Sequence, residues 1–167
     1  MSALDASLPL PTPIGMEGAA VRDAENIAAR IAEDEAAADE ARQAYQAGGL
    51  PAIEPDADAG AILQPEEQLH AIHASALLEE APLLDEVVQP RGGTLYLTSE
   101  RLVHTATEAT EVPLPEIEEM AIALERLVLI RRRNGSDLAL EVDQPRLLRV
   151  QLAAAIAAER ARRTPKP

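Results

Sequence analysis

The chain has 167 residues with 29 acidic and 15 basic side chains, so its formal net charge at pH 7 is −14, and its length suits one ordinary domain with an appendage. Its only aromatic residues are Tyr45 and Tyr96, so it lacks the basic field and the stacking surfaces of most nucleic-acid-binding proteins, and we expect no nucleic-acid partner. It has no cysteine, which excludes disulfides, thiol nucleophiles and thiolate metal sites.

Residues 1–15 are predicted to form a Pro-rich, disordered tail. Pro9, Pro11 and Pro13 fix φ and remove backbone donors, which is incompatible with a helix. The alternative is a short docking motif. The segment has neither a basic start nor an apolar run, so it is not typical of a secretory signal, and the chain has no stretch of about 18 apolar residues. We therefore expect a cytoplasmic protein without a transmembrane segment.

Residues 16–47 are predicted to form an acidic amphipathic helix. The segment has no proline, and Gly48 and Gly49 follow it as a helix stop. Small and large apolar residues recur every three or four positions, interrupted by Asp34. The large side chains of this stripe, Ile27, Ile31 and Tyr45, are candidate contacts with a partner helix. The alternative is a solvated helix that lies on its own domain.

Residues 48–66 contain three prolines and three glycines and are predicted to form a linker. The domain proper is predicted over residues 67–163, where the pattern changes to short alternating segments. An acidic loop with a turn at Gly92 and Gly93 is expected between the first two strands. Seven strands are predicted, at residues 67–76, 94–98, 101–105, 110–114, 120–124, 127–131 and 137–142.

The last predicted element is a helix that begins at Pro145 and ends near Arg163. Asp143 and Gln144 precede it as candidate caps. Leu148, Leu152 and Ile156 recur at helical spacing on one face of this helix. We expect that face to close one open end of the sheet.

Two segments resemble a known family. Gly93–His104, with the sequence GTLYLTSERLVH, resembles the strand-turn-strand of GRAM-like and bacterial PH-like domains, and Glu111–Met120 is similar to the segment that follows it there. The resemblance covers residues 67–160. It implies an α+β, mainly β fold: a seven-stranded antiparallel barrel or sandwich capped by a C-terminal helix, here with an N-terminal helical extension. It also implies a scaffold that recognises peptides, proteins or lipid head groups.

The first loop of this predicted domain departs from the lipid-binding members of the family. Those members carry basic residues between the first two strands, whereas residues 79–86 hold four acids here. Phosphates would meet like charge, so we expect no head-group binding at that place.

Catalytic and metal-binding patterns are absent from the sequence. His70 and His73 differ by an odd number of positions, so on a strand they point to opposite faces and cannot easily share a metal. No nucleophile has an identifiable base, and no Gly-Lys-Ser/Thr follows the glycine pair. We therefore expect neither an enzyme nor a cofactor.

A basic cluster formed by Arg126, Arg131, Arg132 and Arg133 opposes the global charge, since residues 121–167 alone carry +5. These arginines either contact an anion or an acidic partner, or pair with acids of residues 16–47 or with Asp85 and Glu86. The leading hypothesis is a non-catalytic adaptor that binds a protein, a peptide or a second copy at a sheet edge or beside the C-terminal helix. The rival is peripheral binding to anionic lipid through the basic cluster.

Overall fold

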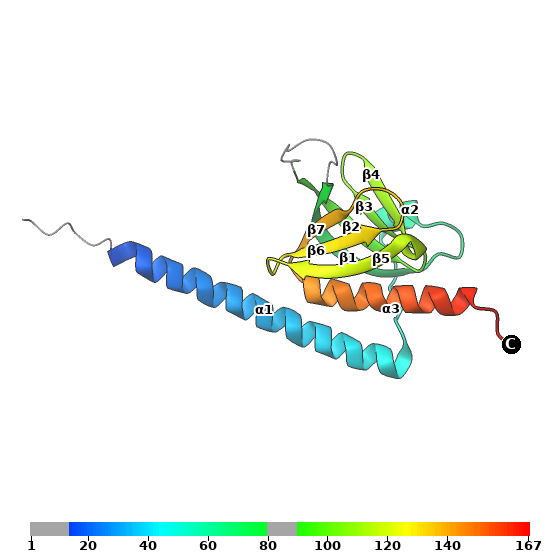
Figure 1. Cartoon of the computed structure of the whole chain (residues 1–167), viewed down its shortest axis with the longest axis horizontal. Helices are drawn as coiled ribbons and strands as arrows, with labels where there is room; N and C mark the ends of the chain where they lie inside the picture. Colours follow the sequence, from blue (N-terminus) through cyan, green and yellow to red (C-terminus); the bar gives the residue numbers. More distant parts are fainter. Residues whose placement is uncertain (1–13, 80–89) are drawn as a thin grey trace, which may run out of the picture. The chain divides into compact units, whose positions relative to one another are not determined.

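The computed structural model describes residues 14–79 and 90–167 (Figure 1). The chain divides into two units, the first ending at Glu33 and the second beginning at Asp34. The boundary lies inside the first helix, α1 (Ile14–Gly48). This helix begins two residues earlier than predicted. It ends at the predicted glycine stop, where Gly49 adopts a φ of 77°. The rest of the predicted tail, residues 1–13, lies outside the described residues.

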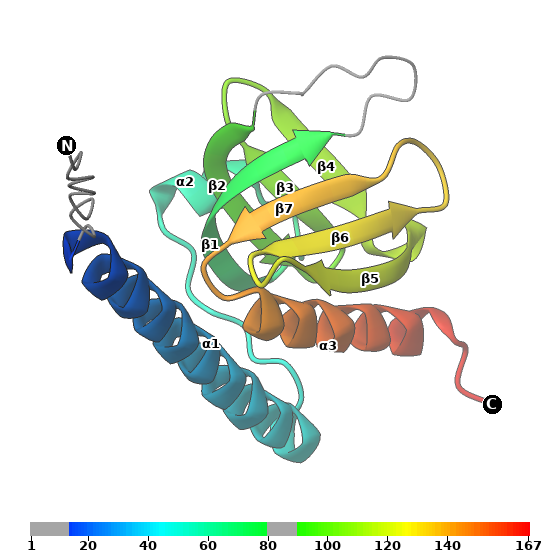
Figure 2. The same ribbon diagram turned by 60° about the vertical axis from the view of Figure 1, so that its left-hand side comes forward.

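The second unit contains an antiparallel sheet, with seven strands within residues 69–79 and 91–142. Its spatial order is β4-β3-β2-β1-β7-β6-β5, and it curls into a half-barrel (Figure 2). The central strand β1 pairs with both β2 and β7, which joins the two meanders. The strands are β1 (Leu69–Glu79), β2 (Arg91–Thr98), β3 (Arg101–Thr105), β4 (Ala109–Pro113), β5 (Ile117–Ala123), β6 (Leu127–Arg132) and β7 (Leu138–Val142). The predicted α+β, mainly β class is confirmed.

The short connection predicted between the second and third strands is also confirmed. Ser99 and Glu100 alone link β2 to β3. Pro113 ends β4, which lies at one edge of the described sheet, where a missing N–H is tolerated. A single 3-10 turn, η1 (Leu114–Glu116), then leads into β5.

The start of β2 differs from the prediction, because Gly92 and Gly93 belong to the strand and do not form a turn. Gly93 pairs with Ser75 of β1. A Cβ atom at Gly93 would lie 1.9 Å from the Thr105 carbonyl oxygen and 3.1 Å from the His104 ring. The glycine therefore allows a close approach between β2 and β3. The acidic loop predicted before it, residues 80–89, lies outside the described residues.

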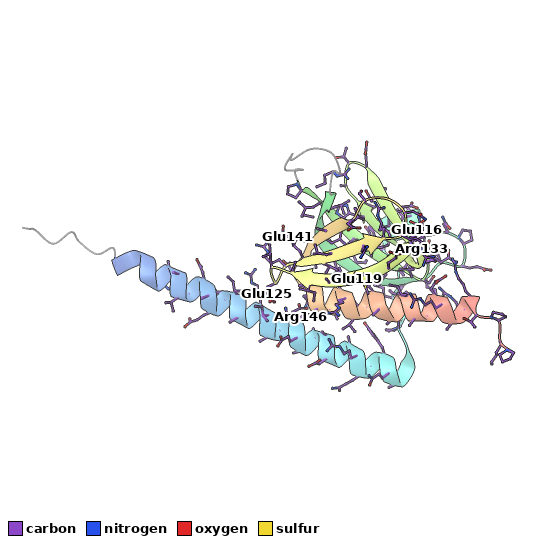
Figure 3. All side chains as sticks on the ribbon, viewed as in Figure 1. Glu116, Glu119, Glu125, Arg133, Glu141 and Arg146 are labelled. Atoms are coloured by element: carbon purple, nitrogen blue, oxygen red, sulfur yellow. The ribbon has the colours of Figure 1, made fainter. Side chains whose placement is uncertain are left out.

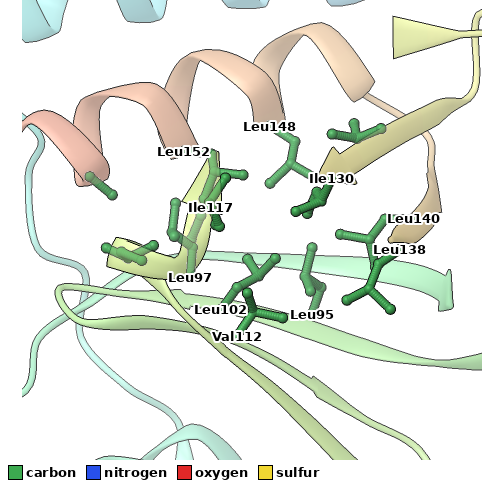
Figure 4. Close-up of a cluster of buried hydrophobic side chains, with 14 of the residues drawn as sticks. Leu95, Leu97, Leu102, Val112, Ile117, Ile130, Leu138, Leu140, Leu148 and Leu152 are labelled. Carbon is green, nitrogen blue, oxygen red and sulfur yellow. The ribbon is translucent and has the colours of Figure 1, made fainter. Parts of the chain in front are cut away.

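The core lies between the curled sheet and the final helix, α3 (Pro145–Arg163), which packs along η1, β5 and β6 and also contacts β1 and β2. Leu148 and Leu152 of α3 are fully buried against apolar side chains of the sheet (Figure 4). Ile156 joins the same cluster. The predicted packing of this helical face is confirmed.

The predicted linker contains a folded element, α2 (Ala57–Ile62). Asp56 caps it, since its Oδ1 accepts the Ala59 N–H at 2.7 Å. Ala59 is completely buried and joins Tyr96 and Val103 in a second apolar cluster. With only one buried residue, α2 has too short a periodic pattern to be recognised in the sequence.

Candidate functional site

The N-terminus of α3 is capped by a side chain from α1. Asp34 accepts the Arg146 N–H at 2.9 Å through Oδ2 and the Leu147 N–H at 3.0 Å through Oδ1, and it is only 2% exposed. The carboxylate thus lies at the positive end of the α3 dipole. The predicted cap was one of the neighbouring residues, but Gln144 occupies the cap position without a side-chain hydrogen bond.

Arg146 gathers acidic side chains around this junction. Its guanidinium lies 3.7 Å from Asp34 and 3.6 Å from Glu35, and it donates a hydrogen bond to Glu125. Figure 3 shows Glu125 and Arg146 side by side at the start of α3. The hydrogen bond to Glu125 raises the pKa of Arg146 above its ordinary value, against the effect of burial. The junction is therefore held mainly by polar and charged contacts.

A pocket of about 470 Å³ opens beside this junction. It is contained within the second unit, where the end of β5, the turn after it, α1 and α3 meet. The described lining holds three acids and three arginines but no histidine. These lining residues are Glu35, Ala38, Asp39, Arg42, Ile122, Glu125, Arg146 and Arg149.

The three arginines that line the pocket differ in whether they form ion pairs. Arg146 is shared among several carboxylates, and Arg42 pairs with Asp39 one helical turn away. Arg149 is exposed and forms no ion pair within residues 14–79 and 90–167. The pocket therefore presents one cation whose charge the described chain leaves without a counter-ion.

The turn between β5 and β6 borders this pocket and has an unusual backbone. Its two central residues, Leu124 and Glu125, have φ values of 52° and 58°, and the Arg126 N–H returns to the Ala123 carbonyl at 3.3 Å. Such left-handed turns favour Asn-Gly, because a Cβ atom costs roughly 1 to 2 kcal/mol there. Leu124 is 83% exposed, so no packing of its side chain offsets that cost.

Replacing Leu124 by asparagine is expected to stabilise the protein by about 0.5 to 1 kcal/mol, since asparagine tolerates the left-handed conformation. Urea unfolding at pH 7 measures the change. Leu124→Ala is the control, because it removes the exposed side chain without relieving the backbone. Equal stabilisation by both variants would show that the exposed leucine, and not the backbone, is responsible.

The arginines of the predicted basic cluster have partners within the second unit. None of these partners lies on residues 34–47, whereas Asp85 and Glu86, two of the predicted partners, lie outside the described residues. The partners lie instead on β5, β7 and the turn before β7, because neighbouring strands bring these side chains into register. Arg126 pairs with Glu141, Arg131 with Glu119 at 3.7 Å and Arg133 with Glu118 at 3.5 Å, and Arg132 donates to the Ser136 carbonyl at 2.6 Å.

The candidate helix contacts are divided between the two units. Ile27 and Ile31 belong to the first unit, where Ile27 is exposed and Ile31 is half-buried. Tyr45 belongs to the second unit and is also half-buried. The predicted stripe is thus not a single surface of one unit.

The histidines have separate environments, as expected for His70 and His73. His70 Nδ1 lies 2.9 Å from the Pro51 carbonyl oxygen, whereas His73 Nε2 lies 2.7 Å from Gln151 Oε1 on α3. In the part of the chain that the structure describes, no group of three or more histidine, aspartate or glutamate side chains could hold a metal ion.

The motif that carries the family resemblance forms a buried polar cluster. Arg101 donates to both carboxylate oxygens of Glu67, at 2.9 and 3.1 Å, and to the Ile62 carbonyl at 2.6 Å. Thr98 donates to Glu67 at 2.5 Å and accepts the Arg101 N–H at 3.0 Å. Both charged side chains are almost completely buried. Thr98 and Arg101 therefore tie the β2–β3 turn to the segment before β1.

Comparisons with known proteins place the chain in no family. No protein-family model matches it, and no curated protein does. Among solved structures, the C-terminal domain of an unknown protein from Leishmania infantum is similar with a TM-score of 0.46 and 15% identity, over 56% of this chain and 87% of that chain. The hSac2 domain from human phosphoinositide phosphatase Sac2 is similar with a TM-score of 0.38 and 12% identity, over 65% and 80% of the respective chains.

None of the helices within residues 14–79 and 90–167 is both long enough and apolar enough to cross a bilayer.

Proposed function

We propose that this protein is a non-catalytic, PH-like interaction module of the cytoplasm that binds an extended peptide segment of a protein partner along β5, beside α3. The observation that carries the proposal is the position of β5. It pairs with β6 on one side and ends the described strand order on the other. Extended peptides bind such edges by adding a strand, with side chains received in adjacent pockets.

The other edge strand of the described sheet, β4, is less suited to this role. It is five residues long and ends at Pro113, which lacks a backbone donor, whereas β5 has seven residues and no proline. The end of β5 also leads directly to the pocket, which Ile122 lines. A peptide paired with β5 could therefore extend a side chain into that pocket.

The charge of the pocket favours an acidic side chain in the peptide. Arg149 lines the pocket and forms no ion pair within the described residues, whereas Arg42 and Arg146 already contact carboxylates. An acid on the peptide would supply the missing counter-ion.

Selection from a phage-displayed library of random peptides tests this function. We expect the selected peptides to share an acidic residue, and we expect a synthetic selected peptide to shift the NMR signals of the β5 amides. Arg149→Glu should weaken its binding by about tenfold, because it replaces attraction with repulsion. Arg160→Glu is the matched control: it reverses an exposed arginine of the same helix that does not line the pocket, and it should leave binding unchanged.

Two results would contradict the proposal. One is a peptide that shifts the NMR signals of strands other than β5, and the other is an equal loss of peptide binding in Arg149→Glu and Arg160→Glu.

Flotation with phosphatidylserine vesicles tests the lipid alternative. We expect no flotation, because the arginines of the basic cluster already have partners. Salt-sensitive flotation that Arg131→Glu and Arg133→Glu abolish would favour the lipid surface instead.

A further inference from the structure

We infer that the second half of α1, residues 34–48, is a removable cover over the groove between α3 and β5, and that Asp34 holds it in place. The inference concerns how access to the proposed peptide site is regulated, and in this respect it rests on the proposed function. The cover itself follows from contacts within the second unit.

The cover occupies one side of the pocket. Glu35, Ala38, Asp39 and Arg42 of α1 line it together with residues of β5, the turn after it and α3. A peptide that follows β5 into this pocket would therefore meet α1. Moving the cover away would leave the α3 and β5 side of the groove open.

The contacts that hold the cover are small and polar. Its only buried residues are Asp34, Ala38 and Ala41, which fall on one helical face. Two alanines bury little apolar surface, and Tyr45, the one large apolar side chain of the cover, is only half-buried, whereas α3 is attached to the sheet by buried leucines. The two hydrogen bonds of Asp34 to the start of α3 and the ion pairs of Arg146 therefore provide most of the attachment.

The connection that follows the cover has room to change conformation. Gly48 and Gly49 end the helix, and a Cβ atom at either position would meet no atom within 4 Å. Glycine pairs accommodate large changes of backbone angle at little cost. The cover can therefore move without disturbing the sheet.

Thiol labelling tests this inference, because the chain has no cysteine of its own. Ala38 is 1% exposed, so Ala38→Cys is protected from a maleimide reagent while the cover is in place. Val128→Cys, at a fully buried position of β6, reports opening of the sheet core, and Ala36→Cys, on the exposed face of α1, reports the unprotected rate. We expect Ala38→Cys to react more slowly than Ala36→Cys but faster than Val128→Cys.

Asp34→Ala should then accelerate labelling of Ala38→Cys by about tenfold, a typical effect of losing a helix cap, and it should accelerate Val128→Cys by no more than this factor, because the Asp34 contact is lost in the unfolded chain as well. Asp34→Asn, which retains one acceptor, should have a smaller effect. Equal labelling rates of Ala38→Cys and Val128→Cys with Asp34 in place would overturn the inference, because the cover would then open only when the whole domain unfolds. If Ala38→Cys fails to fold, Ala41→Cys replaces it with the same expectations.

Measuring the affinity for a selected peptide separates this inference from the proposed function. If both are correct, Asp34→Ala strengthens the binding of a selected peptide, because less free energy is needed to displace the cover. Faster labelling without any change in peptide affinity would retain the cover and reject the proposed site. Unchanged labelling with intact peptide binding would reject the cover and retain the site.

Discussion

Arg101→Ala is expected to destabilise the protein by about 3 to 5 kcal/mol, because it leaves the Glu67 carboxylate buried without its counter-ion. The Ile62 carbonyl loses its donor as well. Urea unfolding followed by circular dichroism measures the loss. Arg160→Ala is the control, since it removes an exposed arginine, and it should change stability by less than about 0.5 kcal/mol.

A double variant distinguishes the cost of an unpaired charge from the value of the pair. Glu67→Met with Arg101→Met removes both charges and keeps much of the buried volume, so it should be more stable than Arg101→Ala alone. A loss below about 1 kcal/mol in Arg101→Ala would show that water or another group compensates Glu67.

The same pair is expected to make stability depend on pH. Burial alone would raise the pKa of the Glu67 carboxyl, but hydrogen bonds from Arg101, the Gln64 N–H and Thr98 outweigh it and hold the pKa below its ordinary value of 4.5. The unfolded chain therefore takes up this proton at a higher pH than the folded chain, so the stabilisation is present above pH 4.5 and is lost as the pH falls below it. Urea midpoints measured at pH 7 and pH 3.5 should differ less in Glu67→Gln than in the unmodified chain.

Leu152→Asp is expected to unfold the second unit. Leu152 is completely buried in the main cluster, between α3 and the half-barrel (Figure 4). Placing a carboxylate there removes the leucine contacts and buries an unpaired charge. Both costs are large at a fully buried position. We expect their sum to exceed the free energy of unfolding, which is roughly 5 to 15 kcal/mol for most domains. The loss of the cooperative thermal transition and of dispersed amide signals in NMR spectra would report it.

Ala153→Asp is the matched control for this variant. It adds the same charge one position along the same helix, at an exposed residue, and should leave the melting transition within a few degrees of that of the unmodified chain. A cooperative transition retained by Leu152→Asp would mean that α3 can leave the sheet without unfolding it.

Local patterns were sufficient to predict most of the fold. Strand alternation, the Ser99 and Glu100 connection and the spacing of Leu148 and Leu152 each depend on neighbours within a few positions, so the sequence displays them directly. The glycine pair before β2 was misleading, because Gly93 is required by the approach of another strand and not by a turn. The short helix α2 was missed because its one buried residue contacts strands distant in sequence.

The candidate site was much less predictable than the fold. The sequence marked Asp34 only as an interruption of an apolar stripe, and its role as the cap of α3 depends on a contact across 112 positions. The pocket likewise draws residues from α1, β5 and α3. The basic cluster was visible, but its partners were decided by strand register, which places Glu118 and Glu119 beside Arg133 and Arg131.

By itself, the sequence determined the seven strands, the two long helices, their order and the mainly β class, because hydrophobic periodicity and turn residues act over short distances. It also determined the acidic charge and the absence of cysteine chemistry. Only the tertiary structure decided where the charges are compensated, which strand is left at the edge beside α3, and which part of α1 belongs to the domain. These properties depend on the distances between groups far apart in the chain, since hydrogen bonds and ion pairs form only after the sheet has brought them within a few ångströms.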